Sequence, residues 1–492
     1  MAAPARIVRA LLIFGSLAVT LAYAAIVIWY AREPAFFDHA EPTIPAVASV
    51  FSAGRPLYPA LDAPERYAHI YGPALFLVHA AALALLGPSI VASKLVGALA
   101  ILVGLVASYS VFRRRADVVG ALSATAVCAL VFATFDNVSY WTRSDPLLVL
   151  CVAVGLLAAH LPSRTLSAIA LGATTGIAVN LKFTGPLYLM PVFAIAVAEH
   201  GARTASRAAL LAVPVAVAPY LLPNVSLAHY WDYVQLSARN GLVTAKVLQN
   251  AEWAAWLAAP LAAVVIDGWK AVQVRRGAAG HLSSLALSMA IVTIAAAKPG
   301  AGPYHLLPFV PVLAYAFLWT TPAPFLTGAR KVLCAAFAAA ASLLAVADQA
   351  LIVRTVPGRN LEAAIADLRR FTDQHPERRV AVGYAGTSYL SHARPEVVFR
   401  TGDYLIDAPA VQEHRLSGLP LPESTMRAIA ECRVEVWLIP HGAAPFAVPS
   451  AYPPEALAEV FPEEFRRAFL GQYARTGEAG GFDVWECRGQ AP

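Results

Sequence analysis

Long apolar runs separated by short polar connectors fill the first 350 residues of the chain. A bilayer core about 30 Å thick requires roughly 20 mainly apolar residues per helix. The first run continues past the small-x-small sequence Ala22-Tyr23-Ala24, so we expect an uncleaved helix and not a signal peptide. The pattern predicts about eleven membrane-spanning helices, at 7–30, 89–112, 117–134, 145–161, 165–179, 184–198, 208–222, 251–269, 281–297, 304–320 and 331–349.

The pattern changes after residue 350, where the long apolar runs end. Residues 1–350 hold 22 basic and 13 acidic residues, whereas 351–492 hold 15 arginines and 18 acidic residues. In this second part, 361–371 has helical periodicity, and 380–384 and 434–439 are short β-rich runs. The sequence therefore predicts a mainly α protein with a transmembrane domain, 1–350, and a small soluble α/β domain, 351–492.

The basic residues orient the chain in the membrane. Most of those before residue 350 lie in short clusters between apolar runs, such as Arg113-Arg114-Arg115, and such clusters favour the cytoplasmic side. These clusters all lie on the same side of the membrane only if the apolar run 71–86 does not span it. We therefore assign 71–86 to an external loop, 31–86, that lies at or dips into the outer interface. The tail then lies on the extracytoplasmic side of the bacterial inner membrane.

Composition excludes several classes of protein. With 58% hydrophobic and 14% charged residues and a mean hydropathy of +0.59, the chain needs lipid as its solvent. The cations form no exposed patch for nucleic acid, because most lie beside membrane helices. Cys432 and Cys487 flank strand-like runs and pair only if the tail is in an oxidising compartment, so their pairing stays open.

Acidic residues in the external loops are candidates for catalysis. Asp38 and Glu41 are spaced i, i+3, so in a helical turn both carboxylates face one cavity, and either can take a proton from a hydroxyl acceptor. The alternative is a pair of solvated loop charges. Asp145 precedes Pro146 at a helix start, where capping alone explains it. A second role in binding a metal or orienting the base stays open.

Cations and histidines at the same face are candidates for binding. Lys182 and Lys298 are isolated cations at predicted outer helix ends, where they meet either a donor phosphate or ordinary lipid headgroups. His39 and His305 are either metal ligands or polar interfacial residues. A divalent metal therefore remains an open alternative with no assigned ligand set.

The order and spacing of several short motifs resemble the GT-C type of integral-membrane glycosyltransferases, which includes protein mannosyltransferases and aminoarabinose transferases. These motifs are Asp38-x-x-Glu41, Ala53 to Pro59, Tyr71-Gly72-Pro73, Gly87-Pro88-Ser89 with Lys94, Arg143-Ser144-Asp145-Pro146, Asn180 to Gly185, and Lys298 to Leu307. They extend over about 320 residues. Many relatives place two acids side by side, whereas His39 and Ala40 separate them here, so the choice of base stays open.

The resemblance implies an activity and roles for individual residues. It implies transfer of a hexosyl or pentosyl group from a polyprenyl-phosphate sugar to a lipid, glycan or protein acceptor on the outer face. Asp38 or Glu41 is then the base, and Asp145 is the second acidic group. Substrate binding is expected of Tyr58, Tyr71, Arg143, Lys182, Lys298, Tyr304 and His305.

A transporter or lipid flippase is the competing class. It predicts charges near the middle of the bilayer and paired broken helices in two halves. Lys94 is the chief charge inside a predicted helix, and it lies near an end. The grouping of polar residues at one face favours the transferase.

Overall fold

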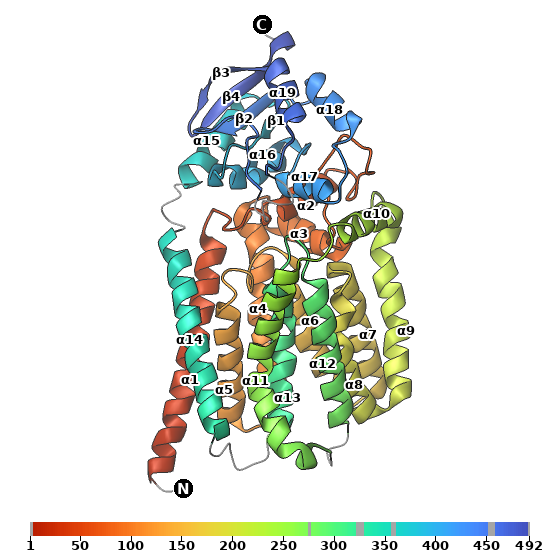
Figure 1. The fold of residues 1–492 in the computed structure, drawn as a ribbon, viewed down its shortest axis with the longest axis vertical. Coiled ribbons are helices and arrows are strands. Elements are labelled where there is room, and N and C mark those ends of the chain that lie inside the picture. The colour runs from red at the N-terminus through yellow and green to blue at the C-terminus, as the bar shows by residue number, and fades with distance from the viewer. Residues whose placement is uncertain (1–2, 274–276, 321–328, 356–360, 451–457, 491–492) are drawn as a thin grey trace. The chain divides into compact units, whose positions relative to one another are not determined.

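A computed structural model describes residues 3–273, 277–320, 329–355, 361–450 and 458–490 of the 492-residue chain (Figure 1). The chain packs as two compact units, each built from three segments. The helical unit comprises Met1–Ala31, Gly97–Pro219 and Leu242–Arg354, and the mixed unit comprises Arg32–Val96, Tyr220–Gly241 and Thr355–Pro492. The external loop predicted at 31–86 and the tail thus belong to the same unit.

A helix lies over each of the eleven ranges predicted to span the membrane, and Figure 1 shows these helices running side by side. They are α1 (Ala3–Arg32), α4 (Ile90–Phe112), α5 (Val118–Ala133), α6 (Ser144–Ala159), α7 (Arg164–Leu181), α8 (Gly185–His200), α9 (Ala202–Val217), α11 (Thr244–Gln273), α12 (Ala278–Ala295), α13 (Val310–Thr320) and α14 (Ala329–Thr355). Two short 3-10 helices, η1 (Ala218–Leu221) and η2 (Pro303–Phe309), interrupt the series.

Among the described residues, five helices are long and apolar enough to cross a membrane: Arg6–Arg32, Ile90–Phe112, Ala202–Leu221, Ala278–Ala295 and Lys331–Thr355. Their outer faces carry exposed large apolar side chains, including Phe14, Leu210 and Leu343. Such faces are unfavourable in water and stable against lipid. The chain is therefore a multi-pass membrane protein, while the count of eleven spans stays a prediction.

Local signals set the ends of several helices. The Asp117 carboxylate accepts a hydrogen bond from the Gly120 N–H and caps α5, and Ser163 caps α7 in the same way through the Leu166 N–H. α3 (Pro73–Leu86) begins with proline and has 14 residues, which is shorter than the roughly 20 residues that a span requires. The run at 71–86 thus forms a short helix that belongs to the mixed unit.

The mixed unit holds a four-stranded sheet of order β1-β2-β4-β3, with helices packed around it (Figure 1). Its strands are β1 (Val380–Val382), β2 (Val436–Pro440), β3 (Tyr473–Ala479) and β4 (Phe482–Cys487). Its helices are α2 (Thr43–Ser52), α3, α10 (Leu227–Ala238), α15 (Leu361–Gln374), η4 (Tyr389–Ala393), α16 (Pro395–Thr401), α17 (Ala408–Leu416), α18 (Glu423–Ala430), α19 (Glu463–Gln472) and η5 (Arg488–Gln490). β1 pairs with β2 in parallel, and the other pairs are antiparallel.

The central strand β2 is buried on both faces, and alternate side chains enter different cores. Val436 and Leu438 pack with Ile365 and Leu368 of α15. Trp437 and Ile439 face the other way, into a cluster rich in phenylalanine. The β-rich runs predicted from the sequence at 380–384 and 434–439 are thus the two neighbouring strands β1 and β2 of this sheet.

The two tail cysteines form a disulfide. Cys432 follows α18 and Cys487 ends β4, and their Cα atoms are 5.9 Å apart across 55 residues of sequence. The bond ties the end of β4, an inner strand of the sheet, to the residues that follow α18. The sequence had left this pairing open. Because disulfides persist in oxidising compartments, the bond is evidence about the side of the membrane on which the tail lies.

The close packing of α7 against α9 depends on a glycine. A Cβ atom at Gly176 would lie 2.5 Å from the Val215 Cβ and 2.7 Å from the Ala212 carbonyl oxygen. Small residues allow membrane helices to approach this closely. A larger side chain at Gly176 therefore tests whether α7 and α9 pack this closely.

We predict that Gly176→Leu lowers the thermal unfolding midpoint of the detergent-solubilised protein, because overpacking costs about 1–3 kcal/mol. Gly15→Leu in α1 is the matched control, since a Cβ there has no atom within 4 Å. Differential scanning fluorimetry measures both midpoints. Equal midpoints for the two variants would contradict the α7–α9 packing.

Candidate functional site

A buried polar cluster in the helical unit contains several of the predicted binding residues. Asp145 lies in the first turn of α6, and Lys182 directly follows α7. The Lys182 Nζ is 3.3 Å from Asp145 Oδ1 and 3.4 Å from His305 Nε2 in η2. Trp141 Nε1 donates to Asp145 Oδ2 at 3.1 Å. Residues separated by up to 164 positions in sequence thus meet in one place.

An arginine and aromatic rings complete this cluster, which we call the Asp145 cluster. Arg143 Nη2 donates to the Tyr304 hydroxyl at 3.1 Å, and its guanidinium carbon lies 4.0 Å from the centroid of the Trp141 ring. Lys182 Nζ lies 5.6 Å from the centroid of the Tyr304 ring. Cation–π contacts of this kind hold a cation in place without neutralising it.

The Asp145 cluster has more positive than negative charge. Asp145 is its carboxylate, whereas Arg143 and Lys182 are cations and Lys298 acts electrostatically on Lys182. Burial lowers the pKa of Lys182, between α7 and α8, to about 8, against the opposing effect of Asp145. A buried charge is costly unless it is paired. Excess positive charge of this kind suits a bound anion such as a phosphate.

Of the three predicted catalytic acids, Asp145 lies in the helical unit, whereas Asp38 and Glu41 lie in the mixed unit and differ in environment. Glu41 is fully buried, and its Oε1 accepts hydrogen bonds from the N–H groups of Phe37 and Asp38, both at 3.1 Å. The side chain of Asp38 is 27% exposed and lies 3.3 Å from His39 Nδ1. Asp38 is thus the more accessible carboxylate, and Glu41 shapes the loop that carries it.

Lys94 lies behind the same loop. Its Nζ donates to the backbone carbonyl of Glu33 at 3.0 Å and to that of Ala35. The ammonium also lies 4.8 Å from the centroid of the Phe37 ring and interacts electrostatically with Glu41. The charge noticed inside a predicted helix therefore orders the loop before Asp38.

Tyr58 and Tyr71 are adjacent in the mixed unit. Tyr58 is fully buried, and its hydroxyl donates to the Tyr71 carbonyl oxygen at 2.7 Å. The Tyr58 ring packs 5.1 Å from the Tyr230 ring, centroid to centroid. These contacts fit a role for Tyr58 in shaping the external loop, and the predicted role of both tyrosines in substrate binding stays a prediction.

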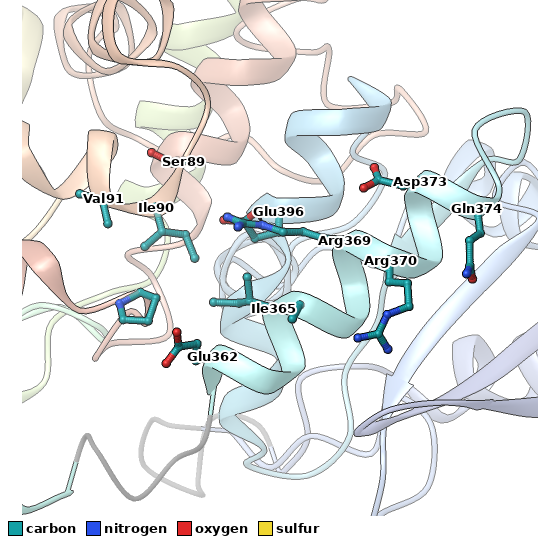
Figure 2. Close-up of a pocket in the computed structure, with 12 residues that line it drawn as sticks. Ser89, Ile90, Val91, Glu362, Ile365, Arg369, Arg370, Asp373, Gln374 and Glu396 are labelled. Atoms are coloured by element: carbon teal, nitrogen blue, oxygen red, sulfur yellow. Dashed lines mark hydrogen bonds and ion pairs between the residues drawn. The ribbon is translucent and has the colours of Figure 1, made fainter.

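A groove of about 600 Å³ lies in the mixed unit between α15 and the first residues of α4 (Figure 2). Arg369 reaches across it, and its Nε donates to the buried Glu396 at 2.8 Å. Ile90 and Ile365 give the groove an apolar floor, and Pro34 belongs to its lining. Guanidinium and carboxylate groups beside apolar surface can bind a polar ligand of moderate size.

Sequence reasoning missed one buried group, formed by His69, Arg394 and Asp407 in the mixed unit. His69 Nε2 is 3.0 Å from Asp407 Oδ2, and Arg394 Nη2 is 2.8 Å from Asp407 Oδ1. In the sequence these residues resemble the other charges of polar segments, and no local pattern marks them. Among the described residues, no group of three or more His, Cys, Asp and Glu side chains is placed to hold a metal ion.

The charge of His69 is predicted to make the mixed unit sensitive to pH. The Asp407 and Glu413 carboxylates and the Tyr71 ring face the imidazole. Burial alone lowers the pKa of His69, but hydrogen bonds to the two carboxylates raise it to about 9. The folded state then holds a proton that the unfolded chain releases near its ordinary pKa of about 6.5, so stability falls as pH rises from about 6.5 through 9.

Thermal unfolding of the full chain in detergent between pH 6 and 9.5 measures this effect. We expect His69→Gln to remove most of the decline in the midpoint over that range. His375→Gln, in the turn after α15, is the matched control and should keep it. A decline of the same size in all three proteins would contradict the assignment.

Comparisons by sequence and by structure differ in outcome. No protein-family model and no curated protein matches the sequence. The crystal structure of ArnT from Cupriavidus metallidurans bound to undecaprenyl phosphate matches over 98% of this chain and 98% of that chain, with 13% identity and a TM-score of 0.56. The apo form of that protein matches over 96% and 98%, with 12% identity and a TM-score of 0.58.

A second kind of protein gives a weaker match. The apo oligosaccharyltransferase of Archaeoglobus fulgidus matches over 86% of this chain and 69% of that chain, with 12% identity and a TM-score of 0.51. At such identities the likeness concerns the fold. The chain has a GT-C-like fold, which confirms the expectation drawn from its motifs.

Proposed function

We propose that the chain is a glycosyltransferase that moves a hexosyl or pentosyl group from a polyprenyl-phosphate-linked donor to an acceptor. The Asp145 cluster carries this proposal. It gathers Arg143 and Lys182 around one carboxylate, and Lys298 acts electrostatically on Lys182. The ArnT structure, which shares this fold, holds undecaprenyl phosphate. Membrane lipids and a lipid, glycan or protein acceptor are the other partners.

Asp38 is our choice for the general base. Its carboxylate takes the proton of an acceptor hydroxyl as the hydroxyl oxygen bonds to the anomeric carbon of the donor sugar. The bond between that carbon and the phosphate oxygen breaks, and polyprenyl phosphate leaves with the electron pair. Glu41 is less suited to this step, because it is buried and accepts two backbone hydrogen bonds.

The Asp145 cluster stabilises the leaving group. The departing phosphate gains one negative charge in the transition state, and fixed cations at that point lower the barrier. Arg143, Lys182 and Lys298 supply the positive charge. Asp145 holds Lys182 in place, and the rings of Trp141 and Tyr304 flank Arg143.

We place the reaction on the extracytoplasmic face of the bacterial inner membrane. The Cys432–Cys487 disulfide supports this side for the tail, because disulfides form and persist in the periplasm. Asp38 belongs to the same compact unit as the tail. The groove beside α15 belongs to that unit too and offers the acceptor a polar surface with an apolar floor.

We predict that Asp38→Asn abolishes sugar transfer, with a loss of about 10²–10⁴-fold, because the amide cannot accept the hydroxyl proton. Mass spectrometry of envelope lipids and glycans, from cells with and without the gene, first identifies the missing sugar and its acceptor. Membranes carrying each variant are then assayed with that donor. Glu463→Gln, at an exposed residue of α19, is the matched control and keeps full activity.

Sugar transfer at the wild-type rate by Asp38→Asn would contradict the assignment of Asp38 as the base. If the wild-type chain moves the labelled lipid across a vesicle membrane and transfers no sugar, the competing transporter or flippase reading is correct instead. The two outcomes separate an error about one residue from an error about the class of protein.

A second prediction concerns donor binding and uses undecaprenyl phosphate as the probe. Lys182→Met removes a buried cation, so we expect its affinity for this lipid, measured by native mass spectrometry in detergent, to fall at least about tenfold. Arg9→Gln, at a half-exposed arginine of α1 that pairs with Asp117, should bind as the wild type does. Unchanged binding by Lys182→Met would remove the phosphate assignment.

A further inference from the structure

The loop that carries Asp38 is fixed by residues more than 350 positions later in the chain. The backbone carbonyl of His39, the residue after Asp38, accepts a hydrogen bond from Arg394 Nη2 at 3.0 Å. The same nitrogen donates to the Thr43 hydroxyl at 3.0 Å, where α2 begins. On the other side of Asp38, the Phe36 carbonyl oxygen lies 3.4 Å from His392 Nδ1. Contacts from one short segment thus flank the candidate base.

Arg394 is itself held rigidly. Its side chain is 2% exposed and pairs with the fully buried carboxylate of Asp407 at 2.8 Å. Its Nε donates to the Tyr404 hydroxyl at 2.9 Å, and its Nη1 donates to the Ser391 carbonyl oxygen at 3.1 Å. All three guanidinium nitrogens therefore have partners.

Asp407 completes the connection from the opposite direction. Both of its carboxylate oxygens accept from the Thr43 hydroxyl at 3.0 Å, and Oδ2 also lies 3.0 Å from His69 Nε2. Asp407 also caps α17 through the Ala410 N–H. The start of α2 and the start of α17 are therefore joined through one buried carboxylate.

The energetics of this ion pair favour a role in positioning the loop over a role in stabilising the fold. A buried ion pair gives little net stability, because removing both charges from water costs about as much as their attraction returns. A hydrogen bond from a charged donor is nevertheless short and directional. The His39 carbonyl oxygen therefore has a fixed position, and Asp38 is joined to it through one peptide unit.

We propose that Arg394, locked by Asp407, is a positioning residue that sets the orientation of Asp38. The tail then serves the reaction by completing the loop that carries the base, without touching donor or acceptor through this residue. This inference rests on the proposed role of Asp38. Positioning residues raise the rate because small errors in the placement of a reacting group cost large factors in catalysis.

Arg394→Gln and Arg394→Lys, in the full chain in detergent, test the proposal. Hydrogen–deuterium exchange followed by mass spectrometry measures the amides of residues 37–41. We expect at least tenfold faster exchange in Arg394→Gln than in the wild type, and partial recovery in Arg394→Lys, because lysine keeps one donor and the charge. The matched control is Arg467→Gln, where the arginine side chain is 74% exposed and exchange should stay at the wild-type rate.

The kinetic readout uses the donor and acceptor that the envelope comparison identifies. We expect Arg394→Gln to lower kcat at least tenfold with an unchanged KM for the donor, and Arg394→Lys to recover part of the loss. A merely structural role would instead lower the amount of folded protein and leave kcat per folded molecule unchanged. That result, or loop exchange at the wild-type rate, would overturn the proposal.

Thr43→Val gives a milder change if Arg394→Gln does not fold. It removes the hydroxyl that accepts from Arg394 and donates to Asp407, and it keeps the volume of the side chain. Faster exchange of the 37–41 amides with a lower kcat supports the proposal, and no change in either quantity overturns it. Failure of the base assignment is seen separately, because Asp38→Asn would then stay active while the exchange results still hold.

Discussion

An ion pair removed from water is the constraint on which both units of this protein depend. In the helical unit, Asp145 and Lys182 meet between helix ends, and in the mixed unit Arg394 and Asp407 meet beneath the external loop. Each pair tolerates burial because neighbouring groups form hydrogen bonds with the remaining donors and acceptors of its two side chains. The difference lies in the surplus charge. The first pair has extra cations around it, whereas the second is enclosed by hydroxyl groups and a histidine.

That difference separates binding from positioning. The Asp145 cluster gathers two cations beside one carboxylate, which suits an anionic ligand, and in the proposed reaction that ligand is the donor phosphate. The Arg394–Asp407 pair needs no ligand, since tyrosine and threonine hydroxyls and backbone carbonyls complete its hydrogen bonds. Its influence reaches the candidate base only through the backbone at His39. One kind of interaction thus serves two purposes, according to what surrounds it.

The division of the chain into units follows from packing and not from hydropathy. The tail alone is polar, yet Arg394 and Asp407 are buried in it, because His39 and Thr43 of the external loop pack against them within the same unit. The likeness of fold at 12–13% identity agrees with this. Apolar helix positions accept many side chains, so two chains that share few identical residues can share one arrangement of helices.

The sequence by itself predicted the helices over the eleven apolar ranges, α15, and the strands β1 and β2, because apolar periodicity acts over a few residues. It also identified Asp38, Glu41, Asp145 and Lys182 as candidates, since charges beside apolar runs are conspicuous. Tertiary structure alone decided that Glu41 is buried while Asp38 is accessible, that Cys432 and Cys487 pair, and that Arg394 and Asp407 lie behind the loop. Burial and pairing depend on residues hundreds of positions apart, and no local pattern records which distant groups will meet.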